Sequence, residues 1–165
     1  MNRYCFLISS LFLFAQSLSA QVINTTLDSF ANIYISAVED NDIETMLTLT
    51  HPDVIAVSGG ETYAKQDLLR DADDYNRLKL RLTSIKTKIS SKIIESGEEL
   101  HALVPYQKIY DSEGLRHEED NFYLAASLDQ GESWTFLDLR KHTVESIPVF
   151  VPAYNGRLNI FLKNP

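Results

Sequence analysis

The spacing of apolar residues changes once along this chain, at Leu78, and the change determines the class of fold. Before Leu78, apolar residues recur every three or four positions, as in helices that bury one face. After it, apolar and polar residues alternate, as in strands whose two faces differ. Helices followed by an antiparallel meander predict an α+β fold with segregated layers.

The first part of the chain predicts three helices and one short strand. Apolar residues from 22 to 38 form one helix face, and Thr25 with Asp28 resembles a capping box. Asn41 is placed to cap a second, short helix, which His51 and Pro52 end. The run 54–57 predicts a buried strand, stopped by 58–60, and 63–75 predicts a third helix.

The second part predicts long antiparallel strands. Alternation runs over 78–89 with one irregularity at Thr83 and Ser84, which suggests a bulge. Strands at 100–110, 115–128 and 133–139 follow, separated by turns that contain Gly97, Gly114 and Gly131.

The N-terminus has the pattern of a secretory signal peptide. Arg3 precedes an apolar run from 5 to 14, and small residues stand just before Gln21. We expect cleavage after Ala20 and a secreted or periplasmic protein. Residues 21–140 would form the domain and 141–165 an extension that packs on it. The only cysteine is Cys5, so the mature chain would have no disulfide and no thiolate site.

Charge and hydropathy limit the partners. The net charge of −8 over 165 residues argues against binding to nucleic acid. No apolar stretch after the signal is long enough to predict an integral membrane span. The densest basic group is either a local binding patch or a solvated strand face, and consists of Arg77, Lys79, Arg81, Lys86 and Lys88.

The C-terminal extension is apolar and broken by prolines. Pro148 and Pro152 argue against a central strand over 147–152, whereas Leu158, Ile160 and Leu162 have strand spacing. The extension either packs across the domain or covers a pocket or a partner subunit.

Two segments resemble the nuclear transport factor 2-like superfamily, which includes SnoaL-type polyketide cyclases and ketosteroid isomerase. "EDNDIETMLTLTHPDVIAVSGG" (39–60) is similar to the family's second helix running into its first strand. "GESWTFLDL" (131–139) is similar to its closing strand. The resemblance implies three N-terminal helices on a curved antiparallel sheet, forming a cone with a pocket at its open end. Folds of this kind host enzymes, ligand binders and interaction modules, so the fold leaves the function open.

The resemblance can be tested at two positions. The isomerases carry a catalytic carboxylate at the end of the first strand, and this chain has Ser58 there, which cannot act as a base near neutral pH. The isomerases also place an oxyanion-donating tyrosine on the first helix. Tyr34 stands at that place, either in this role or as a core residue.

The last predicted strand carries the main candidate site. Trp134, Phe136, Asp138 and Arg140 alternate along one face. If this face lines a cavity, Asp138 beside aromatic rings could act as a general base, and Arg140 could hold an anion. The alternative is a polar strand end in water, with a weak surface ion pair.

His117 is the second candidate catalytic residue. It starts a polar row with Glu119, Asn121 and Tyr123 on one strand face. Such a row is usually the solvated side of an antiparallel sheet, but it could line a wet pocket. Neither a close metal-binding spacing of histidines nor the serine-hydrolase motif is found, and we expect no metal and no cofactor.

The incomplete acid–base set favours a binding domain. Its ligand would be small and partly apolar, and its sheet could also form a homodimer. The expected lining comprises Tyr34, Tyr106, Trp134, Phe136 and Arg140. One alternative is a SnoaL-like lyase, isomerase or hydrolase with Asp138 as base, assisted by His117, Arg140 or Tyr106. Another is a protein-interaction module without a small ligand.

Overall fold

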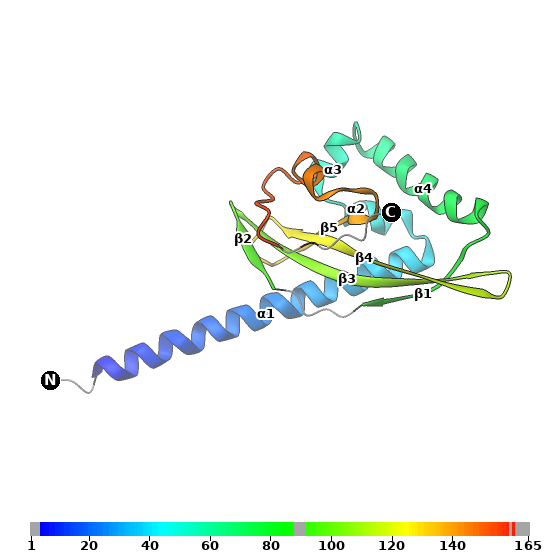
Figure 1. The fold of residues 1–165 in the computed structure, drawn as a ribbon. Coiled ribbons are helices and arrows are strands. Elements are labelled where there is room, and N and C mark those ends of the chain that lie inside the picture. The colour runs from blue at the N-terminus through cyan, green and yellow to red at the C-terminus, as the bar shows by residue number, and fades with distance from the viewer. Residues whose placement is uncertain (1–3, 88–91, 159, 161–165) are drawn as a thin grey trace.

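The fold is α+β, with several helices and an open antiparallel sheet of five strands. The computed structural model describes the backbone of residues 4–87, 92–158 and 160, and side chains from residue 21 onward except Lys141. Four helices come first: α1 (Tyr4–Asp40), α2 (Ile43–Thr48), α3 (Pro52–Val57) and α4 (Glu61–Arg77) (Figure 1). The strands are β1 (Arg81–Thr87), β2 (Ile94–Ser96), β3 (Glu99–Ser112), β4 (Leu115–Ser127) and β5 (Thr135–Asp138). Two 3₁₀ turns (Leu139–Lys141, Val144–Ser146) and the short helix α5 (Ile147–Phe150) follow.

The hairpin of β3 and β4 is the centre of the sheet. The strand order is β1-β3-β4-β5, and β2 pairs with β3 beyond the end of β1. The two central strands stay in register from Leu100 opposite Ser127 to Ser112 opposite Leu115. The predicted irregularity in the first strand is confirmed as a register shift between Leu82 and Ser84.

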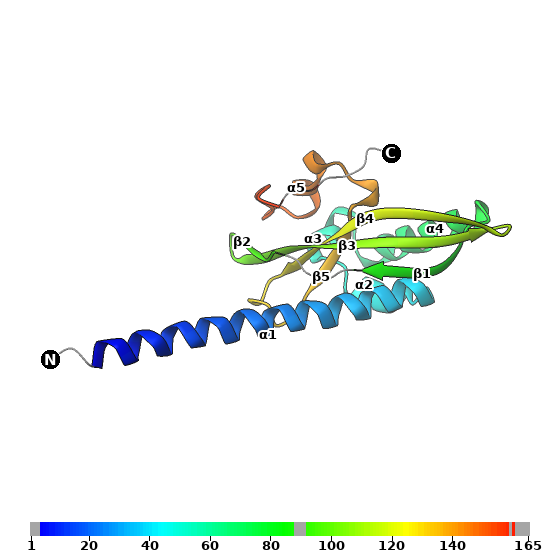
Figure 2. The same cartoon turned by 60° about the horizontal axis from the view of Figure 1, so that its bottom comes forward.

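Each face of the sheet carries its own apolar core. On one face, α1 contributes Leu27, Ala31 and Tyr34, which pack with Tyr123 and Phe136 from the strands. The other face is covered by the C-terminal segment, defined as the described residues that follow β5 (139–158 and 160). Figure 2 shows α1 and α5 on opposite sides of the sheet. The central strands are therefore buried on both faces, which explains why β4 is apolar from Phe122 to Ala126.

The C-terminal segment packs as a part of this second core. Ile147, Val151 and Tyr154 are buried against Leu124 and Leu137 of the sheet. Its backbone is held by side chains as well. Ser96 donates a hydrogen bond to the carbonyl of Ala153, and the Asn155 amide donates to the carbonyl of Glu95 at 3.2 Å.

Two predicted helix starts are wrong. The Thr25 hydroxyl donates to the carbonyl of Gln21 at 2.9 Å, so Thr25 lies inside α1 and caps nothing. Asp42, not Asn41, caps α2 by accepting from the backbone N–H of Thr45 at 3.1 Å. Asn41 instead takes a left-handed conformation with φ 53°, which lets the chain turn between the two helices.

The predicted strand at 54–57 is also wrong, because these residues form α3. The His51 ring caps this helix by accepting from the Asp53 N–H, and Pro52 fits its first turn. A short apolar run fits a strand and a helix equally well, and here the flanking cap and proline decide. The chain pairs with the sheet just before α3, through a parallel β-bridge between Thr50 and Phe136.

Some sequence predictions fall outside the described residues, namely Lys88, Ile89 and Leu162. In the part of the chain that the structure describes, no helix is long and apolar enough to cross a membrane.

A pair of substitutions tests whether the C-terminal segment is integral to the fold. Ile147 is 0% exposed, whereas Val149, two residues on, is 58% exposed. We expect Ile147→Ala to lower the free energy of unfolding by about 2–5 kcal/mol, because it leaves a cavity in the second core. Val149→Ala should change it by less than about 0.5 kcal/mol. Urea unfolding measures both, and equal small effects would contradict this packing.

Candidate functional site

Two adjoining chambers form a cavity bounded by α1, α4 and the end of β5. The first has a volume of about 270 Å³ and the second about 190 Å³. Both are lined by Tyr34, Leu68, Asp71, Asp138 and Arg140. The chambers therefore meet where the sheet ends and the chain turns into its C-terminal segment.

The two chambers differ in their outer walls. The outer wall of the first is formed by α3 and the C-terminal segment, through Val54, Ser58, His142 and Phe150. The second is bounded by α4, β1 and β3, through residues that include Tyr75, Leu82, Lys108 and Tyr110.

Asp138 is the polar centre of the cavity. It accepts hydrogen bonds from the Tyr106 hydroxyl at 2.7 Å, from Lys108 Nζ at 3.2 Å and from the Arg140 backbone N–H at 3.0 Å. The side chain of Lys108 is only 5% exposed and that of Asp138 is 27% exposed. Lys108 Nζ also lies 4.9 Å from the centre of the Tyr106 ring. The carboxylate thus neutralises an ammonium group that the fold has buried.

The tyrosines around this pair remain protonated. Burial raises the pKa of Tyr34 and of Tyr106 well above the usual range, and the negative charge of Asp138 adds to both shifts. Tyr110 and Tyr123 have raised pKa values for the same two reasons, with Glu119 contributing. At physiological pH these hydroxyls are donors, not bases.

Arg140 forms the second charged group of the cavity. Its Nη2 lies 3.4 Å from Asp71 Oδ2, and its guanidinium lies 4.9 Å from the centre of the Tyr75 ring. Burial lowers the pKa of Arg140, which nevertheless stays charged. Among the described residues, neither Arg140 Nε nor the buried hydroxyl of Tyr75 has a hydrogen-bond partner. Two buried donors of residues in the cavity wall therefore have no acceptor in the described part of the chain.

The structure brings together most of the residues singled out from the sequence. The first chamber is lined by Tyr34, Phe136, Asp138 and Arg140. The Tyr106 hydroxyl donates a hydrogen bond to Asp138. Arg140 does not continue the strand row, because the chain enters a 3₁₀ turn after Asp138. Trp134 is wholly buried in the core beside α1 and lines neither chamber.

His117 lies apart from this group. It is exposed near the tip of the β3–β4 hairpin, opposite Tyr110, whereas Asp138 pairs with Tyr123 six residues further along β4. The polar row that begins at His117 turns inward along the strand. Glu119 is half-buried opposite Lys108, where burial raises its pKa, and Tyr123 is fully buried. The row is thus solvated at one end only.

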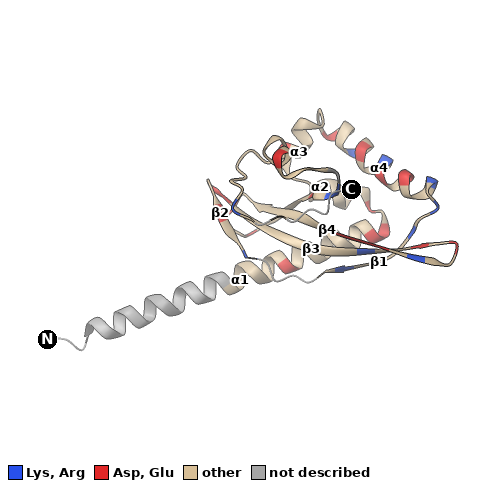
Figure 3. Ribbon diagram, viewed as in Figure 1, with Lys and Arg blue, Asp and Glu red and all other residues tan. Residues whose placement is uncertain are grey.

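Lys108 and Asp71 belong to the site but were not predicted from the sequence as site residues. Lys108 interrupts an alternating row of apolar and aromatic residues on β3, and this interruption was the available signal. Asp71 lies on α4 among several acidic residues, as Figure 3 shows, and nothing in the sequence sets it apart.

The predicted basic patch is partly neutralised. Arg77 binds Asp74 within α4, and Lys79 binds Glu113 at 2.8 Å. Figure 3 shows basic residues of β1 beside the acidic residues of the β3–β4 hairpin. These surface ion pairs favour the interpretation of the basic group as a solvated strand face.

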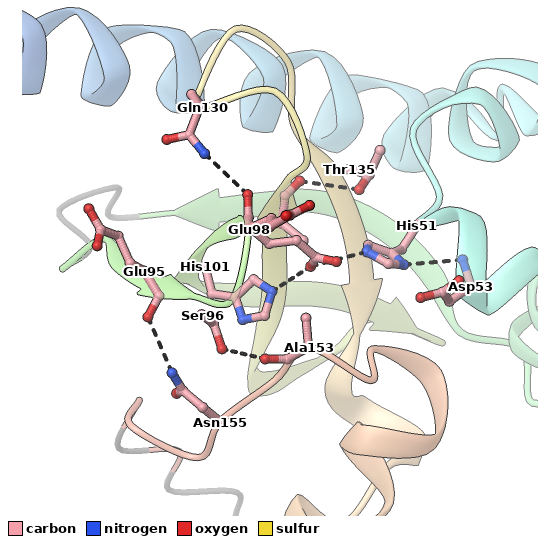
Figure 4. A network of polar contacts seen from close by, with 12 residues as sticks. His51, Asp53, Glu95, Ser96, Glu98, His101, Gln130, Thr135, Ala153 and Asn155 are labelled. Carbon is pink, nitrogen blue, oxygen red and sulfur yellow. Dashed lines mark hydrogen bonds and ion pairs between the residues drawn. The ribbon is translucent and has the colours of Figure 1, made fainter.

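A second polar cluster lies near the start of β3, outside the cavity. Glu99 Oε2 is 2.8 Å from His101 Nε2 and 3.7 Å from His51 Nε2. Figure 4 shows His51 and His101, from two different elements, close to the segment that carries Ala153 and Asn155. Both histidines are buried, at 1% and 0% exposure.

This cluster is poorly suited to a metal. His51 Nδ1 accepts from the Asp53 N–H at 3.2 Å, so the neutral ring carries its proton on Nε2, the atom that faces Glu99. A metal bound to His51 Nε2 would require the ring proton to lie on Nδ1. There it would face the Asp53 N–H, which is also a donor. Across the described residues, no group of three or more His, Cys, Asp or Glu side chains could hold a metal ion.

Comparison of the sequence with models of known protein families finds no match. Comparison with curated proteins finds none either.

Removing the charge of Asp138 tests the buried ion pair. We expect Asp138→Asn to lower the free energy of unfolding by about 3 kcal/mol, because the buried Lys108 ammonium loses the carboxylate that is hydrogen-bonded to it. Lys108→Met in the same chain should restore much of this loss. Glu113→Gln is the matched control, since the Lys79–Glu113 pair is 75% and 70% exposed and should contribute less than about 1 kcal/mol. Equal losses for Asp138→Asn and Glu113→Gln in urea unfolding would show that the inner pair carries no special weight.

Proposed function

We propose that this protein is a binding domain, secreted or periplasmic, that holds a small, partly apolar ligand in the two-chamber cavity. The observation that carries the proposal is a cavity with apolar and aromatic walls and a few convergent polar groups. This combination is typical of small-molecule sites.

The polar part of the ligand would lie where the chambers meet. Among the described residues, Arg140, which lines both chambers, has a buried Nε donor without a partner, and Tyr75 of the second chamber has a buried hydroxyl without one. A ligand atom that accepts from them would recover hydrogen bonds that the empty cavity leaves unmade. Leu68, Phe136 and Phe150 would contact its apolar part.

We also propose membership of the nuclear transport factor 2-like superfamily, with the sheet curving into a cone. The order of helices before an antiparallel meander supports this proposal. One departure stands against it, since 52–57 is helical where the resemblance implied a strand.

An enzyme of the SnoaL type is the second candidate. The close contact between Asp138 and Tyr106, 2.7 Å apart at the cavity wall, favours it. However, Asp138 accepts from three protein donors, one of them a buried ammonium group. A carboxylate held in this way is poorly placed to take a proton from a substrate. We therefore favour ligand binding over catalysis with Asp138 as the general base. His117 is exposed and lies apart from Asp138, so it does not assist in catalysis.

A homodimer through the outer face of the sheet has less support. The C-terminal segment already covers Leu124 and Leu137 on that face. The remainder carries polar residues, among them Gln107 and Asp120, which bind each other at 3.0 Å. An interaction module without a ligand would need a filled interior, and the two chambers weigh against it.

Binding of a neutral fluorescent probe, N-phenyl-1-naphthylamine, tests the proposal. We expect saturable binding to the wild-type protein and its loss in Ala64→Phe, because Ala64 is buried in the wall of the first chamber and a phenyl ring there occupies the space. Thr62→Phe is the control, as Thr62 is exposed on the same helix. Circular dichroism checks that each variant folds.

Absence of binding to the wild type would contradict the proposal, as would equal binding by the two variants. If Ala64→Phe does not fold, Leu68→Phe serves instead, because Leu68 lines both chambers.

A further inference from the structure

The His51–Glu99–His101 cluster joins three parts of the chain. His51 caps α3, Glu99 and His101 lie at the start of β3, and the His101 ring stacks on Tyr154 of the C-terminal segment with centroids 6.1 Å apart. Figure 4 shows the two histidines beside the hydrogen bonds that hold this segment, from Ser96 to Ala153 and from Asn155 to Glu95. The packing of α3 and of the C-terminal segment therefore meets at one buried cluster.

The hydrogen bonds fix where an added proton must go. A carboxylate only accepts, so His101 Nε2 donates to Glu99. His51 Nδ1 accepts from the Asp53 N–H, so its proton is on Nε2. A second proton must enter each ring at Nδ1. In His51 this atom faces a donor and caps α3. In His101 it is buried and has no partner among the described residues.

The surroundings of His51 keep its ring neutral in the folded chain. Burial lowers the pKa of His51, and this effect exceeds the opposite effects of Glu99 and Asp53. The charged and titratable groups around the cluster are Glu99 from β3, Asp53 from α3, the two histidines themselves, and Tyr154 beside His101.

The two elements held by the cluster also form the outer wall of the first chamber. Val54 and Ser58 come from α3 and the residue that follows it, and His142 and Phe150 come from the C-terminal segment. Loosening of either element would open this chamber further to solvent.

We infer that acidification opens the first chamber, because protonation of His51 breaks the cap of α3 and thereby loosens the C-terminal segment that is held at the same buried cluster. A bound ligand is then released at acid pH. The opening is a property of the chain alone, whereas the release rests on the proposed binding function. The sign follows from the lowered pKa of His51. Its contribution to stability is complete above the unfolded pKa of about 6.5 and is lost as pH falls through the lower folded value.

Hydrogen exchange of the ligand-free protein between pH 7.5 and 5.0 tests the opening. Rates are divided by the intrinsic exchange rate at each pH. We expect peptides from α3 and from 143–158 to exchange faster as pH falls, by up to about tenfold per pH unit for each proton taken up. Peptides from the middle of β3 and β4 should stay protected. A flat profile in α3 and 143–158 would overturn the inference, and so would a parallel loss of protection in the central strands.

Histidine variants assign the effect to the cluster. His51→Asn retains a side chain that caps helices, and His101→Gln retains a donor for Glu99, so the double variant should fold and show a flat profile. His117→Gln, at an exposed site, should keep the wild-type profile. A flat profile in this variant would overturn the inference. If the double variant does not fold, the single variant His51→Asn serves instead and should also show a flat profile.

Probe binding separates the two proposals. N-phenyl-1-naphthylamine is neutral at both pH values, and its affinity should fall from pH 7.5 to 5.0 in the wild type but not in the double variant. Equal affinity at both pH values in the wild type would overturn acid release. Absence of binding at pH 7.5 would contradict the binding function, and with it the release, while the exchange profiles would still decide whether acid opens the chamber.

Discussion

The β3–β4 hairpin has to be covered on both faces, and most of the architecture follows from this requirement. Ala102, Val104 and Ala125 face α1, while Leu103 and Leu124 face the C-terminal segment. A sheet that is apolar on both faces needs a layer on each side. The helices α1 and α2 supply one cover. The other cover comes from the last part of the chain, which has little regular structure of its own but contributes Ile147, Val151 and Tyr154.

Within the first layer, one buried charge determines the position of the site. Lys108 lies on the inner face of β3 between tyrosines, where an unpaired ammonium group would be costly. Its counter-charge is Asp138, which is positioned by its own role as the cap of the 3₁₀ turn after β5. Because the strand ends there, Arg140 leaves the strand row and meets Asp71 of α4 across the cavity. Structure and candidate site thus depend on the same carboxylate.

The sequence predicted the parts of this arrangement that depend on local pattern. The strands at 100–110 and 115–128, their turns and the irregularity near Thr83 follow from alternation and glycines. Asp138 stood out because a carboxylate ended an aromatic row. The strand predicted at 54–57 failed because four apolar residues fit either a helix or a strand. The pairs Lys108–Asp138 and Arg140–Asp71 join residues 30 and 69 positions apart, and a single sequence carries no signal of such pairing.

The stability of α3 also depends on contacts with distant parts of the chain. A helix of six residues does not form on its own in water, so it depends on its cap and on packing. The cap here is an imidazole, whose ability to accept a hydrogen bond at Nδ1 ends when it is protonated, whereas a serine or aspartate cap would be far less sensitive near neutral pH. The C-terminal segment is held at the same cluster through Tyr154 and Ser96. The outer wall of the first chamber therefore includes a helix whose cap is lost when an imidazole is protonated, while the sheet beneath it is held by backbone pairing that does not titrate.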